Sequence, residues 1–167
     1  SGVPGTVSGL FTSHKYAKLP FKILIEPAIR LAEKGFVISA GEAKAFNSLQ
    51  PSLEKYNTVP NAFQKPSPWK EGDTLQQPEL AATLKRVQER GAAGFYEGET
   101  ARLIAADMKA NNGLITLDDL KNYQAKERAP LRGTYRGHQI ITMPPPKVRN
   151  RFLKSSLRNS SFSQSAL

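Results

Sequence analysis

The chain has 167 residues, and its 24 lysine and arginine residues against 14 acidic residues give a formal charge of +10. With 39% hydrophobic residues, the composition suits a globular domain and is too apolar for a wholly disordered chain. The absence of cysteine excludes a disulfide framework, a zinc–thiolate site and a thiol nucleophile. No apolar run approaches the roughly 18 residues of a membrane span, so no transmembrane segment is expected. The start shows no targeting signal and no initiator methionine, so we expect the sequence to begin inside a longer protein.

Positive charge is concentrated at the end of the chain. Residues 147–167 contain five basic residues, six serines and no acidic residue, and they follow three prolines at residues 144–146. We therefore expect residues 1–146 to form the structured region and residues 147–167 to form a basic tail without fixed structure. Such a tail can contact nucleic acid or another acidic surface. Its only aromatic residues are Phe152 and Phe162, so stacking on bases gains little support.

The first 56 residues predict helices divided by glycine and proline. Residues 1–9 are rich in glycine and proline and predict a loop. The helical pattern of residues 19–35 is interrupted by Pro27, which favours a main helix that starts near this proline and ends at Gly35. After a short apolar link, a second helix is expected to run toward residue 56. Ser39 and Glu42 predict a capping box at its start, and Pro51 predicts a break in its second half.

The middle of the chain predicts an irregular segment and then more helices. Residues 57–76 are irregular and close on a turn at residues 71–73. Pro78 suits the first position of a helix that ends at Gly91, with a buried stripe formed by Leu80, Leu84 and Val87. Residues 99–111 predict another helix, whose inward residues are Leu103, Ile104 and Met108. A second capping box precedes a short helix that ends near residue 123; its residues are Thr116 and Asp119.

The last part of the structured region changes character. Residues 126–143 contain two runs rich in tyrosine, isoleucine and threonine on either side of Arg136 and Gly137, and this pattern predicts a β-hairpin. Four or five helices followed by a hairpin indicate the α+β class.

No residue pattern in the chain predicts an active site. His14 is expected in a loop and His138 on a strand, and neither has a second histidine at ligand spacing. Asp118 and Asp119 resemble paired acids, but Asp119 already has a capping role. Ser1 has the hydroxyl and amine of a terminal nucleophile, yet the proline and glycine that follow argue against the strand such a nucleophile begins. The segment that contains Gly2, Gly5 and Gly9 lacks the lysine of a phosphate-binding loop.

Several segments together resemble one family, the γ-glutamyltranspeptidases or glutathione hydrolases. Residues 1–9 resemble the family's S-G-x-P-G-T-V-x-G loop, and residues 19–36 resemble its L-P…P-A-I-x-L-A-x-x-G-F stretch. Residues 72–81 resemble G-D-x-L-x-Q-P-x-L-A. The order and spacing of the segments make the match specific. The further matching segments are residues 95–98, residues 112–120 (where Leu114 replaces a second glycine) and residues 135–146 with the Y-R-G and M-P-P-P sequences.

The resemblance implies a helix-rich portion of an N-terminal-nucleophile hydrolase, whose fold is an αββα sandwich. In this family a precursor cleaves itself into a large and a small subunit, and the new terminal threonine of the small subunit attacks the γ-glutamyl amide of glutathione. The acyl-enzyme then passes to water or to an amino acid. The resemblance implies no metal or organic cofactor. It implies a small subunit and the rest of the large subunit as partners, and a periplasmic or extracellular location.

The match corresponds to an interior stretch of the large subunit. The family's substrate-binding arginine is expected upstream of residue 1, and the threonine and the oxyanion-hole glycines belong to the small subunit. We therefore assign no catalytic, substrate-binding or metal-ligating residue to this chain and expect it to be inactive alone. The alternative is a noncatalytic binding module whose basic tail contacts nucleic acid or an acidic surface.

The resemblance ends at Lys147. The family continues with Ser-Ser-Gly-Gly and an apolar helix, whereas this chain continues with its basic tail. We expect the tail to come from a shifted reading frame or an aberrant gene end. Translation of the encoding DNA in the other two frames tests this, because absence of the family sequence there contradicts it. We also expect marginal stability and an exposed apolar patch, since part of the helical surface would pack on strands that this chain lacks.

Overall fold

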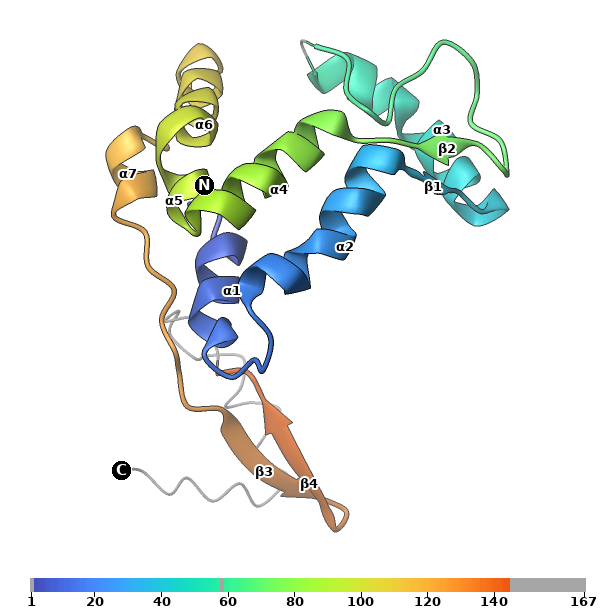
Figure 1. The fold of residues 1–167 in the computed structure, drawn as a ribbon. Coiled ribbons are helices and arrows are strands. Elements are labelled where there is room, and N and C mark those ends of the chain that lie inside the picture. Colours follow the sequence, from blue (N-terminus) through green and yellow to red (C-terminus); the bar gives the residue numbers. More distant parts are fainter. Residues whose placement is uncertain (1, 58, 145–167) are drawn as a thin grey trace. The chain divides into compact units, whose positions relative to one another are not determined.

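The structure, a computed structural model, describes residues 2–57 and 59–144 (Figure 1). The chain divides into two compact units, Ser1–Ala125 and Lys126–Leu167. The described helices and antiparallel strand pairs confirm the α+β class. The first unit contains α1 (Thr6–His14), α2 (Phe21–Lys34), β1 (Phe36–Val37), α3 (Ala40–Tyr56), β2 (Thr74–Leu75), α4 (Pro78–Arg90), α5 (Ala93–Tyr96), α6 (Gly98–Ala110) and α7 (Leu117–Lys121). The second contains β3 (Leu131–Tyr135) and β4 (His138–Thr142).

The prediction of a loop over residues 1–9 was wrong from residue 6 onward, because α1 begins at Thr6 with Gly5 as its N-cap. Gly9 lies inside this helix and its amide donates to the carbonyl of Gly5 at 2.9 Å. The helix has no side-chain cap, so tertiary packing holds it. Val7 and Phe11 are one turn apart and pack against buried residues of other helices. This packing outweighs the low helix propensity of glycine.

The prediction that a main helix starts near Pro27 was also wrong, because α2 begins at Phe21 and continues through Pro27. A proline inside a helix removes one hydrogen bond and costs about 3 kcal/mol. Ile25 is buried and Phe21 packs beside it, both before the proline, and each large apolar side chain contributes about 1.5–3 kcal/mol when fully buried. The two together offset the proline. Gly35 caps the end of α2 as predicted.

The capping box that opens α3 is confirmed. The backbone amide of Glu42 donates to Ser39 Oγ at 3.3 Å, and the amide of Ser39 donates to the Glu42 carboxylate at 2.8 Å. The expected break at Pro51 is absent, because α3 is continuous to Tyr56. Pro51 is exposed and removes only one helical bond, while the half-buried Leu53 continues the packed face beyond it.

The apolar link after Gly35 is a strand that sequence reasoning missed. β1 pairs antiparallel with β2, with Phe36 opposite Leu75 and Val37 opposite Thr74. Next to this ribbon the amide of Gln77 donates to the carbonyl of Ala32 at 2.8 Å, which joins the start of α4 to the end of α2. The predicted turn before β2 is confirmed by the positive φ of 88° at Gly72.

The helices α2 and α4 lie side by side (Figure 1), and Pro78 is the first residue of α4 as predicted. Of the stripe predicted on α4, Leu84 and Val87 face the core, but Leu80 is 42% exposed and Ala81 is buried in its place. The helix predicted over residues 99–111 is α6. Its Ile104 and Met108 pack inward, whereas Leu103 is exposed because the buried face begins with Thr100 and Ala101.

Three buried clusters hold the first unit together. The Trp69 cluster contains Ile38, Ala43, Trp69 and Leu75. The Tyr96 cluster contains Tyr96, Ala101, Ile115 and Leu120. The Ile29 cluster contains Ile25, Ile29 and Val87. Among the described residues no buried side-chain polar atom lacks a hydrogen-bond partner.

The predicted hairpin is confirmed in the second unit. β3 pairs antiparallel with β4 in a five-residue register from Leu131 opposite Thr142 to Tyr135 opposite His138. Arg136 and Gly137 form the two-residue connection, with φ of 48° and 79°. Two positive φ values in succession are those of a type I′ turn, whose twist matches that of the strands. The tail predicted over residues 147–167 lies outside the described residues.

Candidate functional site

The described residues that the sequence raised as chemical candidates belong to different elements or have structural roles. His14 lies at the end of α1, where its Nε2 is 2.9 Å from the carbonyl oxygen of Leu19. His138 is exposed on β4 in the other unit. The amide of Asp119 donates to Thr116 Oγ1 at 3.2 Å, so this acid belongs to the second capping box. Its pKa is lowered by hydrogen bonds from the Thr116 hydroxyl and then from the Thr116 amide. Ser1 lies outside the described residues.

The start of the chain is held by a tyrosine hydroxyl 88 or more residues away in the sequence. Tyr96 donates its hydroxyl proton to the carbonyl of Pro4 at 2.7 Å, and its oxygen accepts from the amide of Ser8 at 3.1 Å. Burial is the largest influence on this hydroxyl and raises its pKa, which keeps it a donor. The hydroxyl of Ser8 in turn accepts from the amide of Ala125 at 2.9 Å. We call Pro4, Ser8, Tyr96 and Ala125 the N-terminal junction.

Gly5 is needed at this junction because of a close approach. A Cβ at Gly5 would lie 2.2 Å from the hydroxyl of Tyr123. The Tyr123 ring stacks on that of Tyr96 with centroids 5.8 Å apart, so it has little room to move. Of the three glycines considered for a phosphate loop, Gly5 therefore serves packing, since it lets the backbone approach an aromatic pair.

A second polar junction joins α4, α5 and α6. Arg86 donates from Nε to the hydroxyl of Thr100 at 3.0 Å, and this hydroxyl donates to the carbonyl of Gly94 at 3.1 Å. Thr100 is buried, so both of its bonds replace water. Gly94 is confined as well, because a Cβ there would lie 2.1 Å from the backbone oxygen of Arg86.

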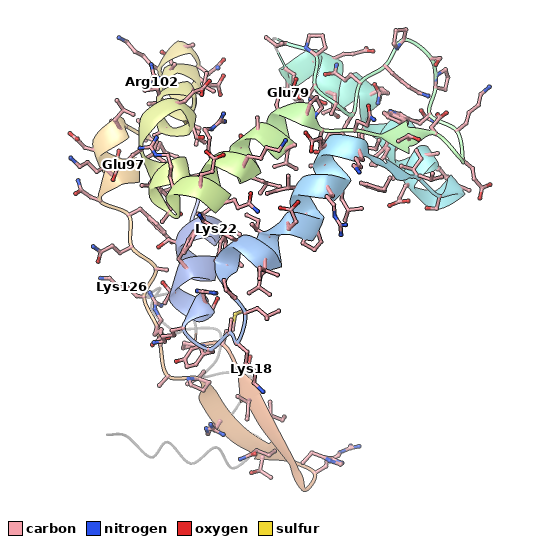
Figure 2. All side chains as sticks on the ribbon, viewed as in Figure 1. Lys18, Lys22, Glu79, Glu97, Arg102 and Lys126 are labelled. Atoms are coloured by element: carbon pink, nitrogen blue, oxygen red, sulfur yellow. The ribbon has the colours of Figure 1, made fainter. Side chains whose placement is uncertain are left out.

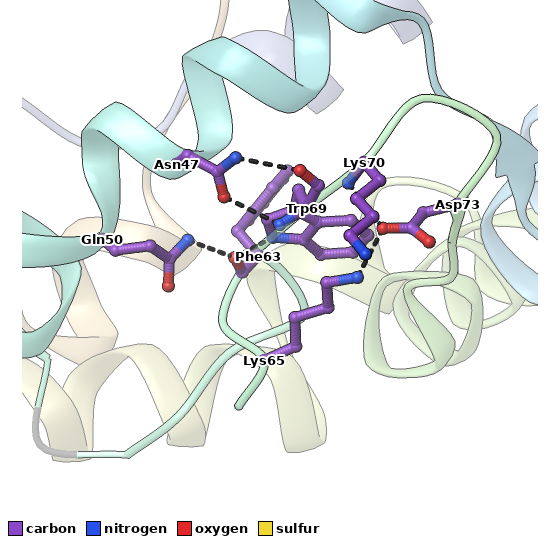
Figure 3. Close-up of polar contacts among 7 residues, drawn as sticks. All are labelled: Asn47, Gln50, Phe63, Lys65, Trp69, Lys70 and Asp73. Carbon is purple, nitrogen blue, oxygen red and sulfur yellow. Dashed lines mark hydrogen bonds and ion pairs between the residues drawn. The ribbon is translucent and has the colours of Figure 1, made fainter. Parts of the chain in front are cut away.

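The loop between α3 and β2 is fixed by the polar contacts drawn in Figure 3. Asn47 bonds both backbone groups of Trp69, donating to its carbonyl at 2.9 Å and accepting from its amide at 2.8 Å. Gln50 and the Trp69 indole both donate to the carbonyl of Phe63. Lys65 pairs with Asp73 and lies over the Trp69 ring, 4.6 Å from its centroid. These contacts anchor the loop on α3.

Hydrogen bonding explains the acidity of Asp73. The Lys65 ammonium, and then the amide of Lys70 at 2.7 Å, hold the pKa of this carboxyl below its usual range. The group stays ionised at neutral pH and acts as an acceptor that closes the turn. It has no feature of a general base, which needs a pKa near the working pH.

Two shallow depressions flank Leu117 at the start of α7. One, of about 280 Å³, is lined by residues that include Glu97, Arg102 and Lys121; the first two are labelled in Figure 2. The other, of about 710 Å³, is lined by residues that include Lys109 and Asp118. The larger one is also lined by Thr116, whose hydroxyl donates to Asp119 at 2.7 Å within the second capping box. Within residues 2–57 and 59–144, no group of three metal-ligating side chains could hold a metal ion, and no helix is long and apolar enough to cross a membrane.

Comparison with known proteins decides the family. The family model for γ-glutamyltranspeptidase matches residues 1–150. The chain belongs to the γ-glutamyltranspeptidase family. The glutathione hydrolase proenzyme of Escherichia coli is 40% identical to it over 151 residues, and the capsule biosynthesis protein CapD proenzyme of Bacillus anthracis is 38% identical over 146 residues. The γ-glutamyltranspeptidase of Helicobacter pylori superimposes with a TM-score of 0.82 at 42% identity.

The γ-glutamyltranspeptidase match covers most of this chain but a minor part of its relatives. It covers 87% of this chain and 26% of the E. coli proenzyme, and 88% of this chain and 43% of the H. pylori chain. The chain therefore spans about a quarter of the length of the curated relatives. The structural likeness confirms the expected fold, a helix-rich portion of the γ-glutamyltranspeptidase architecture.

Four of the segments that resemble the family meet in two pairs. The segment at residues 1–9 meets residues 95–98 through the N-terminal junction. The stretch at residues 19–36 meets residues 72–81 through the β1–β2 ribbon and the bond from Gln77 to Ala32. Sequence reasoning missed these junctions, since nothing local to Tyr96 indicates a partner near residue 4. The order of the family motifs along the sequence locates these segments, but it does not indicate which segment contacts which.

Proposed function

We propose that this chain forms a scaffold portion of the large subunit of a γ-glutamyltranspeptidase. The complete enzyme hydrolyses or transfers the γ-glutamyl group of glutathione through a terminal threonine supplied by its small subunit, and the 167-residue chain is inactive alone. The complete enzyme requires no metal or organic cofactor and acts in the periplasm or outside the cell. These assignments rest on family membership together with the absence of an assembled catalytic group in the described residues.

One observation carries the proposal. Family motifs that are distant in the sequence pack on one another, as the bonds from Tyr96 to Pro4 and from Gln77 to Ala32 illustrate. A motif that contacts another motif through backbone groups maintains the arrangement of helices. We infer that these residues serve the enzyme by shaping the large subunit, while the bond-breaking groups come from elsewhere.

The shifted pKa values agree with a scaffold. Glu42, Asp73 and Asp119 all have lowered pKa values because they accept hydrogen bonds in caps and a turn. Tyr96 has a raised pKa because it is buried. A general acid or base is tuned toward neutrality. The pKa values of these four groups are instead shifted away from neutrality.

Release of p-nitroaniline from γ-glutamyl-p-nitroanilide tests the proposal. The purified 167-residue chain is expected to release no amine above the buffer rate. A chimera in which residues 1–144 replace the aligned segment of the E. coli glutathione hydrolase proenzyme is expected to cleave itself into two subunits and to release the amine. Turnover by the chain alone contradicts its inactivity, and a chimera that does not mature contradicts the scaffold role.

The binding-module alternative stays a prediction, because its basic tail at residues 147–167 lies outside the described residues. It predicts an affinity for nucleic acid or acidic vesicles that falls with salt and disappears when residues 147–167 are deleted. Equal binding by the full and the shortened chain would rule this role out.

A further inference from the structure

The helix α2 is apolar on two different faces. At 100° per residue, Ile25, Ile29 and Ala32 share one face, and all three are buried toward α4 or its neighbours. A second set with exposed side chains runs from the edge of this face around toward the opposite side of the helix. We call it the α2 stripe: Ile23, Leu24, Pro27, Ala28 and Leu31. Ile23 is 56% exposed and Leu31 is 54% exposed.

Four of the five charged residues of α2 occupy the remaining sector, and the fifth, Lys34, is the last residue of the helix, beyond the end of the stripe. Lys22, Glu26, Arg30 and Glu33 follow one another at helical spacing between the two apolar faces. A surface helix of a finished domain has one apolar face and one polar face. The α2 stripe contains no charged residue over more than two turns, and scattered single leucines do not account for a continuous apolar row.

The stripe also accounts for Pro27. Its ring adds apolar surface between Ile23 and Leu31, one turn from each. A proline at this position removes a hydrogen bond, yet it brings no polar group to the exposed surface. The composition of the stripe therefore suits contact with another apolar surface.

On the basis of the proposed function, we propose that the α2 stripe is the docking surface for the remainder of the γ-glutamyltranspeptidase polypeptide. The chain spans only 26% of the E. coli relative, so about three quarters of such an enzyme lies outside it and can cover the stripe. A second copy is disfavoured as the occupant, because each copy carries a formal charge of +10 and the two would repel.

The experiment compares two double variants in the chimera with E. coli glutathione hydrolase. In the first, Ile23→Gln and Leu31→Gln make the stripe polar. In the second, Lys22→Gln and Arg30→Gln place two glutamines on the charged sector of the same helix. The yield of soluble, self-cleaved two-subunit enzyme is measured for each. The stripe variant is expected to lose more than about tenfold, since glutamine buried against an apolar surface lacks a partner. The control is expected to keep its yield.

The 167-residue chain provides a second measurement. There the stripe faces water, so both double variants are expected to keep the urea midpoint of the unmodified chain. A stripe variant that unfolds the isolated chain overturns the docking role, because the residues are then needed inside this portion. Sedimentation of the same chain shows whether a second copy occupies the stripe. If the unmodified chain forms a dimer and the stripe variant does not, the proposal is also overturned.

The outcomes separate this inference from the function on which it rests. An unmodified chimera that does not mature contradicts the proposed function and the docking role together. A chimera that matures equally with and without the stripe substitutions leaves the function standing and overturns the docking role alone. A loss confined to the stripe variant supports both.

Discussion

The helical unit and the hairpin unit are specified in different ways. In residues 2–57 and 59–125, three buried clusters and two polar junctions hold the helices. In the hairpin, every residue of β4 is exposed, including the neighbours Ile140 and Ile141, which point to opposite faces of the strand. Backbone pairing and a type I′ turn fix the register of the hairpin, but a lone two-stranded sheet is marginally stable. Burial determines stability in the first unit, and local turn chemistry determines geometry in the second.

The largest expected effect comes from removing a core side chain. Leu120 is 0% exposed in the Tyr96 cluster, so Leu120→Ala is expected to lower the free energy of unfolding by about 2–5 kcal/mol. The matched change Ile141→Ala in the hairpin is expected to alter it by less than about 0.5 kcal/mol, because this side chain is 55% exposed. Urea denaturation followed by circular dichroism measures both. Equal losses would remove the distinction between the units.

The next effect comes from a glycine confined by backbone. Gly94→Ala is expected to destabilise the helical unit by about 1–3 kcal/mol or more, since its Cβ would lie 2.1 Å from the carbonyl oxygen of Arg86. Gly41→Ala in α3 is the control. Its Cβ would have only Ser39 Oγ nearby, at 4.0 Å, so this variant is expected to gain about 0.4–1 kcal/mol. A Gly94→Ala chain as stable as the unmodified one would mean that α4 and α5 are less closely packed than described.

The N-terminal junction gives a smaller effect with a specific location. Tyr96→Phe removes the hydroxyl that bonds Pro4 and Ser8, and it is expected to cost about 1–3 kcal/mol. Hydrogen exchange is expected to quicken at the amide of Ser8 in particular. Tyr56→Phe, at a residue that is 74% exposed, serves as the control and is expected to change neither quantity. Unchanged exchange at Ser8 would exclude the junction as an anchor for α1.

The smallest effect on stability is expected when the pH is lowered. The pKa values of Glu42 and Asp119 are lowered in the folded chain by the bonds they accept in the two capping boxes. Their contribution to stability is therefore present above the unfolded pKa values near 4 and is lost as pH falls through the lower folded values.

The urea midpoint of Glu42→Ala is accordingly expected to lie below that of the unmodified chain at pH 6 and to approach it below about pH 4. Glu54→Ala, in the same helix away from the cap, controls for the loss of a carboxylate. A gap between Glu42→Ala and the unmodified chain that widens on acidification would contradict the capping role.

Local signals in the sequence were sufficient for the features that depend on neighbouring residues. Both capping boxes, the helix start at Pro78 and the hairpin turn at Arg136 and Gly137 were predicted, because each rests on residues at most three positions apart. The family could be predicted for a similar reason, since its motifs keep their order and spacing along the chain.

Features that depend on distant residues were not predicted. Pro27 and Pro51 were taken as helix boundaries because the sequence does not reveal the burial that carries a helix across a proline. α1 was missed because its stability comes from Val7 and Phe11 meeting residues of other helices, at least 10 positions away in the sequence. The junction at Tyr96 spans 92 residues, and no pattern near either end identifies its partner.

The anchored loop before β2 has a practical consequence for spectroscopy. Trp69 is the only tryptophan of the chain, and it is 6% exposed with the Lys65 ammonium over its ring. Fluorescence excited at the indole absorption band thus reports on one place, the attachment of this loop to α3. Its emission is expected to shift to longer wavelength when that attachment opens, whether or not the hairpin stays paired. A single intrinsic chromophore can therefore follow the detachment of this loop without any label.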